Sequence, residues 1–249
     1  MEQTIEGFRR IYVWEAPVRI FHWLNVLSII ALAGTGIIIA NPPAIMSGTE
    51  ATNQYWFGIT RFVHFVAAYV FIIGLTMRVI WSFLGNKYAS WKVFFPYTRK
   101  GLHNLIHVLK MDVLLGKPKK FDCTELAVGH NAMASISYFL FFLLMAAQIL
   151  TGFGLYSDMA TGWFPKMFSW VVPMLGGDFA ARLIHHVIMW MMIIFSVVHV
   201  YLVMYHDWLE GRSEVSSMFG GYKFVRPKRL LKSTEEREAK AATAEKKDI

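Results

Sequence analysis

Four long apolar runs constrain the fold of this 249-residue chain more than any other feature. They span about 20–41, 57–84, 131–156 and 183–206, and crossing a bilayer takes about 20 apolar residues. A chain in lipid must satisfy its backbone hydrogen bonds internally, so each run is expected to be a helix. The sequence therefore predicts an all-α membrane protein, with a four-transmembrane-helix bundle in residues 1–210.

Composition agrees with a membrane protein and excludes several other classes. Hydrophobic residues make up 55% of the chain and charged residues 17%, against about 25% charged in soluble domains. The single cysteine, Cys123, excludes a disulfide framework, a Cys-rich metal site and covalently attached haem. The first apolar run also contains Ala31-Leu-Ala33, which resembles a signal-peptide cleavage site, but it continues to Ala40 and is interpreted as a membrane span.

The distribution of lysine and arginine predicts the orientation. Three lie in 1–19, eight in 86–125 and ten in 207–249; with Arg78 they make 22 of the 25. By the positive-inside rule, these segments and both termini are expected to be cytoplasmic. The net charge of +8 thus reflects membrane topology, and no nucleic-acid partner is expected.

Two segments outside the spans carry weaker expectations. An amphipathic helix is expected at 102–115 in the cytoplasmic connector, and the aromatic outer loop 157–181 is expected to lie on the membrane surface. Residues 211–249 form a basic cytoplasmic tail that we expect to be partly disordered.

Histidines inside the spans are the candidate functional residues, because ionisable groups in a membrane are costly and usually functional. His64 and His185 or His186 are expected near the outer side, and His22 and His199 near the cytoplasmic side. Two pairs at matching depths are what two haems with paired histidine ligands require. We therefore predict two b-type haems in the bundle.

Helix geometry chooses between the neighbouring histidines. His185 precedes His199 by 14 residues, which places the two about 40° apart around a helix, whereas His186 is about 140° away. His185 is therefore the predicted ligand and His186 a bystander. The same spacing separates the two haem levels by about 21 Å along the axis.

Arginines three residues before the histidines form a second pattern. Arg19, Arg61 and Arg182 precede His22, His64 and His185, and residues at i and i+3 share a helix face. Each guanidinium is a candidate partner for a haem propionate. Snorkelling at a helix end is the alternative; it explains Arg19 well but is disfavoured for the two outer arginines.

Other small and polar residues leave alternatives open. Gly36, 14 residues after His22, could admit the outer haem or simply allow helices to pack closely. His130, Asn131 and His206 are either helix-end residues or part of a quinone pocket beside the inner haem. His103 and His107, one turn apart in the connector, are interpreted as solvated surface rather than a metal site.

These segments resemble the cytochrome b subunit of membrane-bound nickel–iron uptake hydrogenases and, more distantly, the haem subunit of membrane formate dehydrogenases. The similarity covers roughly residues 10–225 and rests on four groups of residues: 15–23, 61–65, 129–131, and 185–190 with 199–201.

The resemblance implies the partners and the electron path. Hydrogenase small and large subunits would lie on the periplasmic side of the bacterial inner membrane. The chain would carry electrons from their iron–sulfur centres through both haems to quinone, as a subunit of an oxidoreductase complex rather than an enzyme alone. Two rivals remain: the same bundle serving formate dehydrogenase or another periplasmic dehydrogenase, and a haem-free membrane anchor or transporter.

Overall fold

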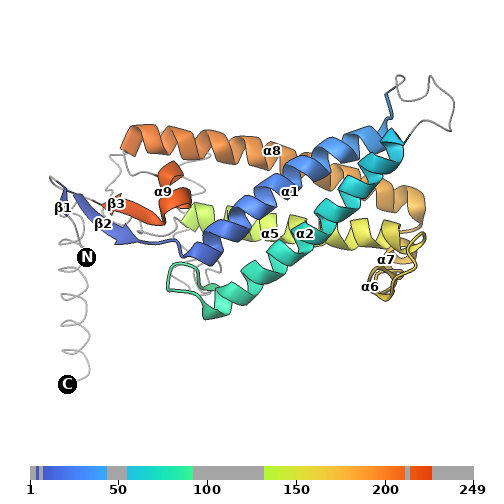
Figure 1. Ribbon diagram of the computed structural model, residues 1–249, viewed down its shortest axis with the longest axis horizontal. Helices are drawn as coiled ribbons and strands as arrows, with labels where there is room; N and C mark the ends of the chain where they lie inside the picture. The colour runs from blue at the N-terminus through green and yellow to red at the C-terminus, as the bar shows by residue number, and fades with distance from the viewer. Residues whose placement is uncertain (1–3, 6–7, 44–54, 92–131, 211–213, 226–249) are drawn as a thin grey trace. The chain divides into compact units, whose positions relative to one another are not determined.

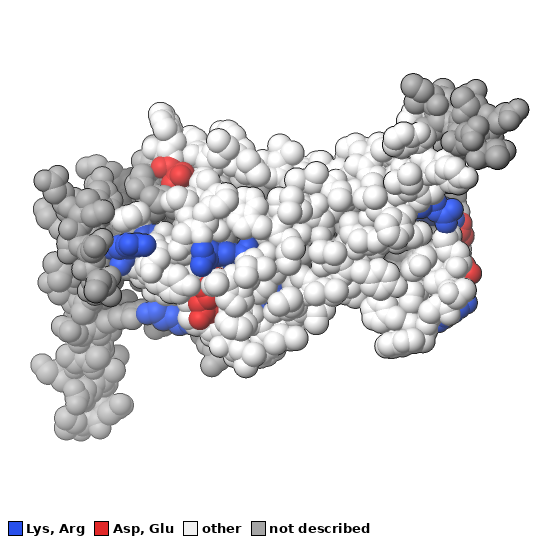
Figure 2. Space-filling model, in the orientation of Figure 1, with Lys and Arg blue, Asp and Glu red and all other residues white. Residues whose placement is uncertain are grey.

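The protein is described from a computed structural model, which covers residues 4–5, 8–43, 55–91, 132–210 and 214–225. Four long helices dominate it: α1 (Ala16–Ala40), α2 (Trp56–Leu84), α5 (Ala132–Ser157) and α8 (Asp178–Glu210) (Figure 1). All four are long and apolar enough to cross a membrane, and within the described ranges they correspond to the four predicted spans. Figure 2 shows charged side chains toward the ends of these helices and an uncharged surface between them.

The helices begin where the sequence provides suitable residues. Pro17 falls in the first turn of α1, where its missing N–H costs no intrahelical hydrogen bond. α8 follows Gly176 and Gly177, which have φ values of 91° and 105°. It opens on Asp178, whose carboxylate is favourable at the positive end of the helix dipole.

The middle parts of the four helices, residues 20–83 and 139–200, form one compact unit. Its core joins α2, α5 and α8 through buried residues such as Phe71, Ile149, Phe153 and Met192. Large apolar side chains also face outward; Ile30 and Val197 are each 65% exposed. Such a surface is costly in water and is what a lipid-facing bundle presents.

The second unit comprises residues 1–19, 84–138 and 201–249, and it contains a small sheet that the all-α prediction missed. Strands β1 (Thr4–Ile5), β2 (Phe8–Tyr12) and β3 (Tyr222–Val225) pair antiparallel in that order. A short helix, α9 (Glu214–Gly220), precedes β3. The prediction failed because β2 and β3 are short and pair across more than 200 residues of chain, which no local pattern records.

Gly221 makes the turn between α9 and β3 possible. Its φ is 83°, and its carbonyl accepts hydrogen bonds from the backbone N–H groups of Val13 and Trp14. A Cβ at this position would lie 2.6 Å from the Trp14 carbonyl oxygen. The hydrogen bonds to Gly221 therefore connect the first part of the tail to the segment before α1.

The bounds of the elements differ from the expected ones mainly at the fourth span. α8 begins five residues earlier than predicted, at Asp178, because Gly177 ends the preceding turn. The outer loop contains two short helices, α6 (Trp163–Lys166) and α7 (Val171–Met174). The expected amphipathic helix at 102–115 and the tail beyond 225 lie outside the described residues.

Candidate functional site

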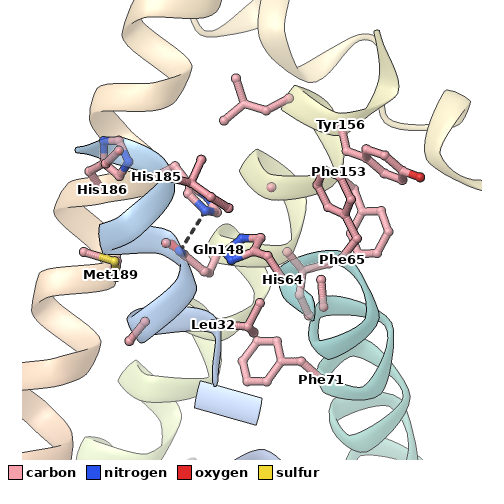
Figure 3. A pocket seen from close by; sticks show the side chains of 18 of the residues that line it. Leu32, His64, Phe65, Phe71, Gln148, Phe153, Tyr156, His185, His186 and Met189 are labelled. Carbon is pink, nitrogen blue, oxygen red and sulfur yellow. Dashed lines mark hydrogen bonds between the residues drawn. The ribbon is translucent and has the colours of Figure 1, made fainter. Parts of the chain in front are cut away.

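His64 on α2 and His185 on α8 line one cavity of about 480 Å³. This is the size of pockets that hold organic cofactors, about 300–1,000 Å³. All four long helices contribute to its walls, and most of the lining is apolar (Figure 3). The two histidines that the sequence pairs therefore line the same cavity, and their shared ligation of a haem stays a prediction.

Each of the two imidazoles contacts a threonine hydroxyl through Nδ1. Thr35 Oγ1 lies 2.8 Å from His64 Nδ1 and donates to the Ala31 carbonyl at 2.6 Å. Thr151 Oγ1 lies 2.9 Å from His185 Nδ1 and donates to the Ala147 carbonyl at 2.8 Å. The two contacts hold the rings from their Nδ1 sides.

Gln148 occupies the other side of the His185 ring. Its Nε2 lies 3.2 Å from His185 Nε2, and its Oε1 is buried without a hydrogen-bond partner among the described residues. Figure 3 shows the His185 ring turned toward Gln148 and His64. Nε2 of His185 thus faces the space between the helices.

Two glycines allow the backbone to approach the rings. A Cβ on Gly36 would lie 3.5 Å from His64 Cε1, and one on Gly152 would lie 3.1 Å from His185 Cε1. The first is ordinary contact and the second is tighter than carbon pairs normally adopt. The sequence pointed to Gly36, which lines the cavity as expected, but not to Gly152.

Arg61 and Arg182 also line the cavity, and their predicted pairing with haem propionates stays a prediction. Arg61 donates to the Met159 sulfur, and its guanidinium lies 5.9 Å from the centre of the Phe65 ring. Arg182 pairs with Asp178 at 2.7 Å through Nε, in an exposed ion pair. Two cations at one end of an apolar cavity suit a ligand that is apolar with anionic substituents.

His186 lines the same cavity, so its helix phase does not remove it from the site. Its ring centre lies 6.3 Å from that of His185. Figure 3 places it to the side away from His64. The assignment of His185 rather than His186 as a ligand stays a prediction, supported by this geometry.

The second predicted pair is His22 on α1 and His199 on α8, and both residues belong to the unit formed by residues 20–83 and 139–200. The His199 ring stacks on Phe195 at 6.0 Å, and the His22 ring meets Trp23 edge-on at 5.3 Å. Nδ1 of His22 is buried and has no hydrogen-bond partner among the described residues. Among the described residues, His22 therefore has no counterpart of the Nδ1 contacts that His64 and His185 make.

Arg78 is a residue whose role sequence reasoning missed. It follows His64 by 14 residues on α2 and is 8% exposed, which is rare for a cation in an apolar bundle. Its guanidinium lies 5.9 Å from the ring centres of both Phe21 and Phe142. Arg78 was used only to predict the orientation of the chain. Its spacing of 14 residues from His64 could also have placed it at the level of the second histidine pair.

Three other predicted residues lie elsewhere. Arg19 donates to the Phe219 carbonyl within the second unit. Its Nε is buried without a hydrogen-bond partner among the described residues. His130 and Asn131, the candidate quinone residues, lie outside the described residues.

The donor set fits haem rather than a bare metal ion. Within the described ranges, no group of three or more His, Cys, Asp or Glu side chains could hold a metal. His64 and His185 would hold the iron of a haem through their imidazoles, and the porphyrin would supply the other ligands. An apolar cavity with glycines beside the rings and arginines at one end suits that cofactor.

Comparison with known proteins agrees with this fold and site. The family described as prokaryotic cytochrome b561 matches residues 13–221. A probable Ni/Fe-hydrogenase B-type cytochrome subunit of Cupriavidus necator is 39% identical over 223 residues, 88% of each chain. A protein of the same name from Azotobacter vinelandii is 37% identical over 92% of this chain and 94% of its own.

A third relative, the probable Ni/Fe-hydrogenase 1 B-type cytochrome subunit of Escherichia coli, is 33% identical over 90% of this chain and 94% of its own. The expected resemblance to hydrogenase cytochromes is thereby confirmed. With four helices suited to crossing a membrane, the chain is a multi-pass membrane protein that belongs to the prokaryotic cytochrome b561 family.

Proposed function

We propose that this chain is the di-haem b-type cytochrome that anchors a nickel–iron hydrogenase in the bacterial inner membrane and passes its electrons to quinone. The observation that carries the proposal is the His64–His185 pair facing one apolar cavity with two arginines in its lining. Relatives named as hydrogenase cytochrome subunits, similar over most of their length, support the choice of partner.

His64 and His185 would hold the outer haem, and His22 and His199 the inner one. Paired imidazoles leave no open position on iron, so each haem supplies one-electron transfer and no oxygen chemistry. Arg61 and Arg182 are placed to bind the propionates of the outer haem by charge-assisted hydrogen bonds. Asp178 competes for Arg182, and the exposure of that ion pair leaves the arginine able to exchange partners.

At the inner level, the proposed propionate partner is Arg19, and the structure adds Arg78 as a second candidate cation. Arg78 is held against the aromatic rings of Phe21 and Phe142, and Phe21 adjoins His22. A buried guanidinium beside the inner pair would stabilise negative charge there. His130 and Asn131 stay candidates for the quinone site.

α8 carries a proposed ligand to each haem, His185 and His199, on one continuous helix. Hydrogen bonding within the helix keeps the two imidazoles at a constant separation along its axis, about 21 Å for 14 residues. The proposed orientation, with both termini cytoplasmic, follows from the 22 basic residues near that side. It places the His64 level on the periplasmic side, where the hydrogenase subunits would dock.

Haem content in single variants tests the proposal. A pyridine haemochrome assay on the purified complex should return two haems per chain in the wild type and fewer than two in His185→Ala. His186→Ala is the matched control and should keep both. Haem retained in His185→Ala but lost in His186→Ala would reverse the assignment of the ligand.

The partner is tested by purification from solubilised membranes. Hydrogenase large and small subunits should co-purify with the tagged full chain, and hydrogen should reduce its haems. Co-purification of formate dehydrogenase subunits instead would replace the partner while keeping the haem sites. A wild-type protein without haem would overturn the proposed function as a whole.

A further inference from the structure

Thr35 and Thr151 contact the two outer histidines in the same way, although they lie on different helices. In each case the hydroxyl donates to the carbonyl four residues earlier, at 2.6 Å and 2.8 Å. In each case the same oxygen lies within 2.9 Å of a histidine Nδ1. The helices α1 and α5 thus present the same arrangement of contacts to the two histidines.

The chemistry of the hydroxyl decides which ring nitrogen carries the proton. A threonine has one O–H, and the backbone carbonyl takes it in both cases. The oxygen can then only accept from the imidazole, so Nδ1 must be the N–H donor. In a neutral ring this leaves the lone pair on Nε2, which is the nitrogen available to bind iron.

A separate contact points to the same tautomer of His185. Gln148 Nε2 is an amide nitrogen, which can only donate, and it lies 3.2 Å from His185 Nε2. Nε2 of His185 is therefore the acceptor.

We propose that Thr35 and Thr151 hold His64 and His185 in the tautomer with Nδ1–H, present both Nε2 atoms to the cavity, and so lower the reduction potential of the outer haem. The proposal rests on the proposed haem sites. A hydrogen bond from Nδ1–H makes an imidazole a stronger electron donor, which favours ferric over ferrous iron. The buried Nδ1 of His22 has no hydrogen-bond partner among the described residues, so the effect is expected at the outer haem.

The test replaces each hydroxyl with a methyl group of similar size. Thr35→Val and Thr151→Val are made in the full chain and purified as the complex. Thr35→Ser and Thr151→Ser restore the hydroxyl. Thr76→Val on α2 is the matched control, because Thr76 also donates to the carbonyl four residues earlier, at 2.8 Å, but is exposed.

The readouts are a redox titration of the haem absorbance and the low-spin ferric signals in electron paramagnetic resonance. The outer haem is identified as the component missing from His64→Ala. In the valine variants its midpoint potential should move upward. A tenfold greater loss of affinity for ferric than for ferrous haem corresponds to a shift of about 59 mV. The serine variants and Thr76→Val should titrate as the wild type does.

Each outcome decides the proposal. Loss of the outer haem in the valine variants with recovery in the serine variants supports it, because only the hydroxyl differs. Unchanged potentials and resonance signals in both valine variants overturn it, as does equal loss of haem in the serine variants. Absence of haem from the wild type would overturn the proposed function instead, so the two failures are distinguishable.

Discussion

Replacing Gly152 with alanine should disturb the outer haem selectively. The added Cβ would lie 3.1 Å from His185 Cε1, whereas carbon atoms normally rest about 3.5–4.0 Å apart. The ring must therefore move by roughly 0.4–0.9 Å. Thr151 and Gln148 contact its two nitrogens, so the movement stretches at least one of these hydrogen bonds.

The energetic cost of Gly152→Ala can be compared with that of the same substitution at Gly34. Overpacking of a packed interior costs about 1–3 kcal/mol, and alanine recovers about 0.5–1 kcal/mol of helix propensity. Gly34→Ala is the matched control, because a Cβ there meets nothing within 4 Å. We expect Gly34→Ala to be neutral or stabilising and Gly152→Ala to be less stable than it by about 1–3 kcal/mol.

Thermal unfolding in detergent, followed by release of haem absorbance, measures both variants. In Gly152→Ala the outer haem should be released at a lower temperature and its ferric resonance signal should broaden, while the inner haem changes little. Identical release curves and spectra for Gly152→Ala and Gly34→Ala would refute the reasoning, because the ring would then tolerate the added carbon.

Three further predictions concern the electron path, the topology and the sheet. His64→Ala should stop quinone reduction by hydrogen while the attached hydrogenase still reduces a soluble dye. His22→Ala should leave the outer haem reducible by hydrogen but block quinone reduction. Full quinone reductase activity in His22→Ala would contradict a quinone site beyond the inner haem. A reporter active only in the periplasm, fused after Ile249, should be silent, because 22 of 25 basic residues lie near the proposed cytoplasmic side; an active fusion would invert the orientation. Gly221→Ala should destabilise the sheet by about 1–2 kcal/mol or more, since it forces a side chain into the left-handed region. Limited proteolysis should therefore cut the Gly221→Ala variant faster than Gly220→Ala, because the Cβ added at Gly220 meets nothing within 4 Å.

Local helix geometry made much of the site predictable. Apolar runs of sufficient length predict spans whatever their neighbours are, because the backbone must hydrogen-bond to itself in lipid. The 14-residue spacings from His22 to Gly36 and from His185 to His199 then follow from the helical repeat alone. Gly36 lines the cavity with His64, as that repeat predicts.

The small sheet of the second unit could not be predicted from local helix geometry. β2 and β3 pair across most of the chain, and their register depends on a turn at Gly221 that has no local apolar pattern. Composition predicted only a basic, partly disordered tail at 211–249, and it did not predict α9 and β3 in the first part of that tail. Composition describes an average over a segment and cannot report a pairing partner distant in sequence.

The sequence by itself predicted four apolar spans, the helix that carries each candidate histidine and the arginines that precede three of them. Only the tertiary structure decided that Thr35 meets His64, that Thr151 and Gln148 flank His185, and that Gly152 lies against its ring. These contacts depend on how each helix is rotated and where it crosses its neighbours. A membrane helix is apolar toward both lipid and core, so its hydrophobic pattern carries little information about which face turns inward.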